Sequence, residues 1–137
     1  MSISHRIEPA RRLVINIARG EITGEDLISA QGATAADPKF DPGFDQLLDL
    51  REAVLTDIPA STIAHLAAGS AYRPTSRRAI VVTDLHALAL VRMFRGRTED
   101  RRGQIELFSD LAEAEAWLQR GQTPATAPSP ETRPAGG

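Results

Sequence analysis

The sequence lacks cysteine, which excludes disulfides, thiol catalysis and cysteine-ligated metal or iron–sulfur sites. Its single lysine, Lys39, lies in the turn-rich stretch DPKFDPG, a poor setting for Schiff-base chemistry. No apolar run approaches the ~18 residues of a membrane span. The three histidines, His5, His65 and His86, are scattered. The opening residues, MSISHRIEP, lack the apolar segment of a secretory signal, so we expect a cytoplasmic protein.

The charge balance argues against nucleic acid as a partner. Sixteen basic residues against eighteen acidic ones give a net charge of −2, whereas duplex-binding domains carry a basic excess. Arginine almost completely replaces lysine and alanine is abundant, which is typical of GC-rich bacterial genomes. Apolar residues make up 42% and charged residues 25%, as in soluble globular domains.

The hydrophobic pattern predicts an α/β fold. An opening hairpin is followed by alternating helices and strands, which implies a mainly parallel sheet with right-handed crossovers. Thr23 and Asp26 have the spacing of a capping box, and Ser61 is in position to cap a short helix. The expected strands are 3–8, 12–18, 44–50, 79–82 and 105–108, and the expected helices are 23–36, 62–68, 85–95 and a last one following Ser109.

The last seventeen residues differ in composition from the rest. The segment 121–137 has four prolines, three glycines and no valine, isoleucine, leucine or aromatic residue. Such a segment cannot bury enough apolar surface to offset its ordering entropy. We therefore expect one domain over residues 1–120, followed by a disordered tail.

The chain lacks the common catalytic motifs. It has no dinucleotide-binding glycine pattern, Walker A sequence, HExxH or GxSxG. His65 and His86 could bind a metal with Asp57 or Asp84, and Ser61, His65 and Asp57 could form a hydrolytic triad. Capping would occupy the Ser61 oxygen, however, and nothing indicates an oxyanion hole. We expect no catalytic residues, metal or cofactor.

The predicted helix 85–95 carries two apolar arcs, although a helix that covers one sheet face needs one. The second arc is either covered by neighbouring elements or available to a protein partner, a second copy in a homodimer, or a small lipophilic ligand. One arc holds Leu85, Ala89 and Met93; the other holds Ala87 with the candidate apolar contacts Leu90, Val91 and Phe94.

Polar residues collect at two predicted strand-to-helix junctions. Helix capping alone would account for them, but in open α/β sheets ligands and partners bind beyond the carboxyl ends of the strands. The candidate partner-binding residues are Asp57, Ile58, Ser61, Thr62, Thr83, Asp84 and His86.

Three blocks, FDQLLDLREAVLTDIPASTIAHLAAG, SRRAIVVTDLHALALVRMF and QIELFSDLAEAEAWL, resemble the SpoIIAA-like branch of STAS-domain proteins. The resemblance covers residues 3–118 and implies a β–α superhelix with four to five strands and helices mainly on one face. It also implies a function in binding. In this family, anti-sigma-factor antagonists dock on a kinase-like partner and are switched by serine phosphorylation. The family has an architectural likeness to lipid-binding CRAL-TRIO domains.

The phosphorylation switch of those antagonists does not carry over to this chain. The aspartate before their serine matches Asp57, but the serine position holds Ile58, and Pro59 follows. The resemblance therefore favours a divergent, non-enzymatic regulatory module that acts through protein–protein interaction. The alternative is a carrier or sensor of a small apolar, lipid-like ligand.

Overall fold

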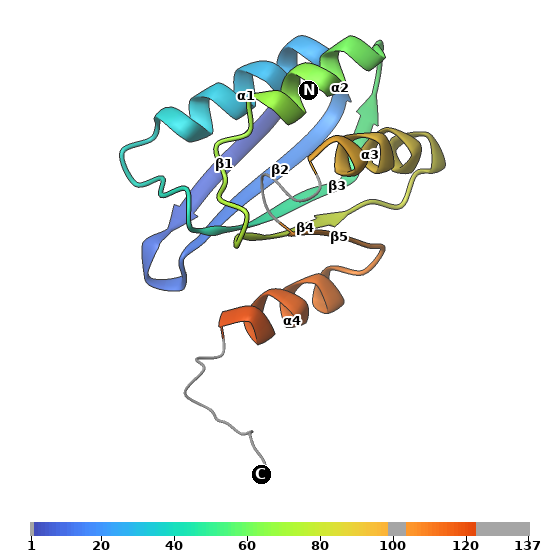
Figure 1. Ribbon diagram of the computed structural model, residues 1–137. Coiled ribbons are helices and arrows are strands. Elements are labelled where there is room, and N and C mark those ends of the chain that lie inside the picture. The colour runs from blue at the N-terminus through green and yellow to red at the C-terminus, as the bar shows by residue number, and fades with distance from the viewer. Residues whose placement is uncertain (1, 99–103, 123–137) are drawn as a thin grey trace.

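A computed structural model describes residues 2–98 and 104–122 of the chain (Figure 1). The last helix ends at Gln122, and the remainder of the predicted tail, 123–137, lies outside the described residues. The elements are β1 (Ser2–Glu8), a 3-10 turn (Pro9–Arg11), β2 (Leu13–Ile22), α1 (Gly24–Ala36), β3 (Asp45–Leu55), α2 (Ala60–Ala68), β4 (Arg77–Val81), α3 (Leu85–Thr98), β5 (Gln104–Phe108) and α4 (Leu111–Gln122).

The five strands form one sheet in the order β1-β2-β3-β4-β5. β1 is antiparallel to β2, and every other neighbouring pair is parallel. Helices connect the parallel strands, as such crossovers require. The predicted α/β class, with an opening hairpin and a mainly parallel sheet, is confirmed.

Helices cover both faces of the sheet, but unequally. α1, α2 and α3 lie on one face and α4 alone lies on the other (Figure 1). The face under α1–α3 buries a core that includes Ala18, Ile22, Leu50, Ile80 and Val91. The α4 face buries Leu13, Ile15, Leu47, Ala79, Val81, Ala114 and Leu118.

β3 is longer than the sequence pattern indicates, because a bulge interrupts its alternation. Ile17 pairs with Asp49 but Arg19 pairs with Glu52, so β3 has one residue more than β2 over this stretch. An extra residue moves the following side chains to the opposite face. The residues of β3 on the α1–α3 side are consequently Gln46, Leu48, Leu50, Ala53 and Leu55.

The capping residues were predicted correctly for α1 and wrongly for α2. The Thr23 side chain accepts from the Asp26 N–H, and the Asp26 carboxylate accepts from the Thr23 N–H. α2 begins at Ala60, one residue before Ser61, with Pro59 at the N-cap and no side-chain capping bond. Proline serves there because its fixed φ suits the start of a helix.

Trp117 fastens α4 to the sheet. Its backbone carbonyl accepts a 2.7 Å hydrogen bond from Nη1 of Arg77, whose guanidinium lies 4.7 Å from the indole centroid. The centroid of the Phe108 ring lies 5.7 Å from that of the indole. The indole thus contacts the sheet through a cation and a second ring, both of which stabilise the pair beyond area burial.

We expect Trp117→Ala to lower the free energy of unfolding by about 2 kcal/mol, less than for a fully buried tryptophan because the ring is half-buried. Leu85→Ala is the control: Leu85 is 81% exposed, and the change should stay within ~0.5 kcal/mol. Urea unfolding followed by circular dichroism measures both. Equal midpoints for the two variants would show that α4 contributes little to the fold.

Candidate functional site

A cavity of about 130 Å³ lies between the sheet and helices α1, α2 and α3. Its size is close to the ~150 Å³ of an apolar protein cavity that binds benzene. Most of its wall is aliphatic or aromatic. The apolar lining includes Leu27, Leu48, Leu50, Leu55, Ile63 and Leu90.

Helical periodicity and small side chains create this space. Leu27, Ala30 and Thr34 of α1 recur at spacings of three and four, which places them on one face of that helix. Thr34 is hydrogen-bonded to Asn16 of β2, whereas Ala30 has only a methyl side chain, so room remains between the helix and β3. On α3, Leu90 and Phe94 share a face by the same spacing and line the opposite wall.

A chain of buried hydrogen bonds crosses the cavity floor. The Nδ2 of Asn16 donates to Thr34 Oγ1 (3.2 Å), and Gln46 Nε2 donates to Asn16 Oδ1 (2.8 Å). Arg78 donates from Nε to Gln46 Oε1 and from Nη1 to Ser70 Oγ, both at 3.0 Å. We call these five residues the polar ladder. It links β2, β3 and β4 to α1 and to the loop before β4.

Arg78 is the charged member of the ladder, and it is only 4% exposed. Its guanidinium lies 4.4 Å from the Tyr72 ring centroid and 5.4 Å from that of Phe94. Burial lowers the pKa of Arg78 to about 10, which leaves it charged at neutral pH. The protein therefore holds a positive charge in a wall of a mainly apolar cavity.

Tyr72 supplies a second polar atom beside that charge. The residue is 7% exposed and lines the cavity, with the Phe40 ring edge-on to its own at 5.4 Å. Burial raises the pKa of Tyr72 to about 12. Within the described residues, its Oη is the one buried side-chain polar atom that has no hydrogen-bond partner. An orphaned hydroxyl of this kind costs free energy.

Most of the predicted edge residues are exposed. Asp57, Thr83, Asp84 and His86 are all exposed. β3 continues for six residues, 50–55, beyond the point at which its Asp49 pairs with the last residue of β4. The junction at Asp57 consequently lies beside the end of β2, where the Thr56 N–H donates to Ile22. The junctions after β3 and β4 are not opposite each other along the sheet.

Three other residues of the predicted edge lie around the start of α2. Ile58 is half-buried and lines the cavity. Thr62 packs against Gly24, where an added Cβ would lie 3.1 Å from the threonine Cγ2. Ser61 is exposed in the first turn of α2. Asp57, just before them, has a positive φ of 53°, an uncommon conformation outside glycine.

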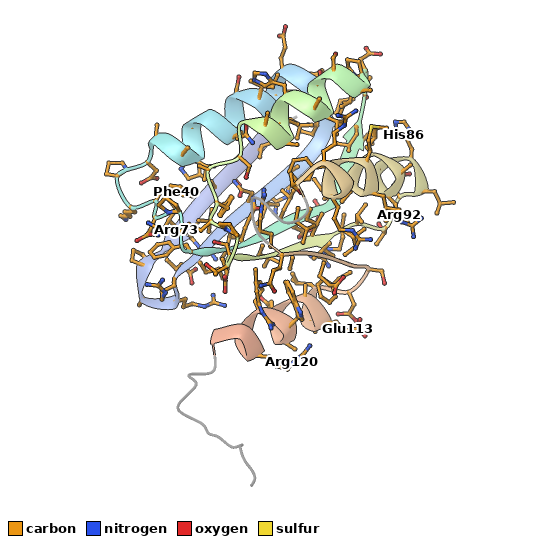
Figure 2. The ribbon with its side chains drawn as sticks, viewed as in Figure 1. Phe40, Arg73, His86, Arg92, Glu113 and Arg120 are labelled. Atoms are coloured by element: carbon orange, nitrogen blue, oxygen red, sulfur yellow. The ribbon has the colours of Figure 1, made fainter. Side chains whose placement is uncertain are left out.

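The two apolar arcs of α3 have different surroundings. The candidate contacts Leu90, Val91 and Phe94 all line the cavity. In the other arc, Leu85 and Met93 are exposed. Figure 2 shows His86 near the start of this helix, on the side of the sheet opposite Glu113 of α4.

Residues 2–98 and 104–122 contain no group of three or more histidine, aspartate or glutamate residues that could hold a metal ion. Over the same ranges, no helix is long and apolar enough to cross a membrane. Among the described residues, those that line the cavity include no histidine, aspartate or glutamate.

We expect Tyr72→Phe to leave the free energy of unfolding unchanged at neutral pH or to raise it by up to ~1 kcal/mol, because the lost hydroxyl has no partner. Thermal or urea unfolding measures this. A loss above ~1 kcal/mol would mean that the hydroxyl is bonded in the folded protein.

The same variant tests the raised pKa of Tyr72. Between pH 10 and about 12 the unfolded chain releases the phenol proton and the folded protein keeps it, so the stability of the wild type falls as pH rises. The fall should reach ~3 kcal/mol relative to the Phe variant. Tyr72 is the only tyrosine, so tyrosinate absorbance reports this titration directly. Parallel pH profiles for the two proteins would contradict the burial of the hydroxyl.

Comparison with solved structures gives an informative similarity. No protein-family model matches the sequence, and no curated protein matches it significantly. The fold is similar to the crystal structure of an uncharacterised protein of the DUF3478 family, with a SpoIIAA-like fold, from Shewanella loihica PV-4 at 2.25 Å resolution. The TM-score is 0.56 at 21% identity, over 85% of this chain and 94% of that one. The chain therefore has a SpoIIAA-like fold, as its resemblance to that branch implied.

Proposed function

We propose that the protein is a non-enzymatic binding module that carries or senses a small, mainly apolar ligand in the cavity under α1, α2 and α3. The observation that supports this most is the cavity itself. Protein interiors pack with few voids larger than a water molecule. A space of about 130 Å³ with a mainly apolar wall is therefore unusual, and it is large enough for a small ligand.

The chemistry of the lining supports binding over catalysis. General acid–base catalysis needs a titratable group near neutral pH beside the reacting atoms, most often histidine or a carboxylate. The described lining offers amides, a threonine hydroxyl, a tyrosine and an arginine. These groups orient a ligand, whereas none of them is suited to exchange protons with it at neutral pH.

We expect 1-hexanol, a neutral probe, to bind in the cavity and shift the backbone amide NMR signals of its lining residues. Leu90→Trp should abolish these shifts, because an indole at this half-buried position of α3 fills the space. Ala89→Trp is the matched control: Ala89 is the neighbouring, exposed residue, and its variant should bind as the wild type does. Absence of binding by the wild type would refute the proposed function.

Protein–protein interaction is the second candidate, and the exposure of Leu85 favours it. This large apolar side chain is 81% exposed and stands between the exposed residues Asp84 and His86. Together with Met93 on the same arc, it is what a protein partner or a second copy of the chain would cover. Regulation through such a contact would fit the binding role that the SpoIIAA-like resemblance implies.

Pull-down from the native host with the wild type, Asp57→Arg and Glu113→Arg tests this candidate. Both variants reverse one exposed carboxylate, but Glu113 lies on α4, across the sheet (Figure 2). A partner that docks at the junction after β3 should be lost with Asp57→Arg and kept with Glu113→Arg. Identical partners in all three samples would remove Asp57 from the docking surface.

A further inference from the structure

The outer side of α3 carries an apolar stripe. Leu85, Ala89 and Met93 follow one another at intervals of four residues, which places them along one side of the helix. Leu85 is 81% exposed, Met93 is 41% exposed, and Ala89 is exposed between them. Leu90 and Phe94 line the cavity on the inner side of the same helix. We call Leu85, Ala89 and Met93 the outer stripe. Two large apolar side chains exposed on one line of a helix are typical of a surface that a partner covers.

The charges of this helix are divided along its length. Asp84, at its start, is exposed, and one oxygen of its carboxylate accepts from the Ala87 N–H at 2.9 Å. The helix itself contains no acidic residue. Its arginines all lie in the second half, namely Arg92, Arg95 and Arg97. Residues 99–103, which follow, contain two acidic and two basic residues and add no net charge. α3 is therefore negative at its start and positive toward its end.

This pattern is self-complementary when two copies of α3 pack in antiparallel orientation. With the Ala89 residues of both copies at the centre, Leu85 of each copy lies opposite Met93 of the other. The alanines let the two helices approach closely, and the larger side chains fill the space on either side. Along the shared axis, Arg92 of one copy lies ~3 Å from Asp84 of the other, within reach of an arginine side chain. A parallel arrangement would instead place arginine beside arginine.

We propose that the protein forms a homodimer through the outer stripes of two α3 helices, antiparallel about a two-fold axis at Ala89. The same patch serves both subunits, as in an isologous interface. This inference rests on the second candidate function, protein–protein interaction, and names a second copy of the chain as the partner. A helix pair buries less surface than a permanent interface does, so the dimer is weak, with a dissociation constant on the order of 10 to 100 µM.

Two charge reversals test the pairing, because each places like charges at both ends of the interface. Arg92→Asp brings a carboxylate toward Asp84 of the other copy, and Asp84→Arg brings a guanidinium toward Arg92. Each variant alone should have a dissociation constant raised at least tenfold, since like charges across an interface cost several kcal/mol. An equimolar mixture of the two should recover the dimer, because both contacts in the mixed dimer join opposite charges. Sedimentation equilibrium of the full chain measures this.

Two further variants complete the experiment. Glu113→Arg reverses an exposed carboxylate on α4, across the sheet, and should dimerise as the wild type does. Ala89→Glu brings two carboxylates to the centre of the interface and should abolish the dimer. Should Asp84→Arg fail to fold because its cap is lost, Ala89→Glu and Arg92→Asp decide together.

The remaining outcomes contradict the inference. A wild type that stays monomeric at about 500 µM would overturn it, while the pull-down and the titration with 1-hexanol still decide the two proposed functions separately. A dimer that survives both charge reversals would overturn it as well, because the contact would then lie elsewhere. A dimer that is lost in both folded variants and is not recovered in their mixture would exclude the antiparallel pairing.

Discussion

The need to satisfy a buried guanidinium organises one side of this protein. The Arg78 guanidinium donates to the side-chain carbonyl of Gln46. The Gln46 amide in turn donates to Asn16, and Asn16 donates to Thr34 on α1. Since a slip of one residue in any of these strands would turn its polar side chain to the other face, the ladder fixes the register of β2, β3 and β4. It also sets the distance between α1 and the sheet. The polar groups therefore hold apart the walls of the cavity that they line.

Consecutive arginines serve the two faces of the sheet in different ways. Side chains alternate along β4, so Arg77 points toward α4 and Arg78 toward α1–α3. Arg77 binds the carbonyl and ring of Trp117 and secures the helix that covers its face of the sheet. Arg78 stands instead in the wall of the cavity. The same residue type thus fastens one layer and gives the other its charge, and only the position in the strand differs.

The architecture was open to prediction from the sequence, because alternation between strands and helices is a local signal. Residues close together in the chain predict the α/β fold class, the opening hairpin, the capping box of α1 and the apolar arc of α3 that faces the cavity. They do not predict the end of β3, since the bulge breaks the two-residue period that reveals a strand.

The polar ladder was missed for another reason. Asn16, Gln46 and Arg78 each lie in a predicted or neighbouring strand stretch and look unremarkable alone. Only the pairing of β2, β3 and β4 shows that they meet, although polar residues on the inward face of three strands were a signal that could have been followed.

The distribution of the two rarest aromatic types has a practical consequence. The single tyrosine stands in the layer of α1–α3, and the single tryptophan stands on the α4 side of the sheet. Each layer thus contains its own intrinsic chromophore. Phenol absorbance reports events around the cavity, while indole fluorescence reports the attachment of the last helix. Loosening of one layer can consequently be distinguished from loosening of the other in the unlabelled wild-type protein.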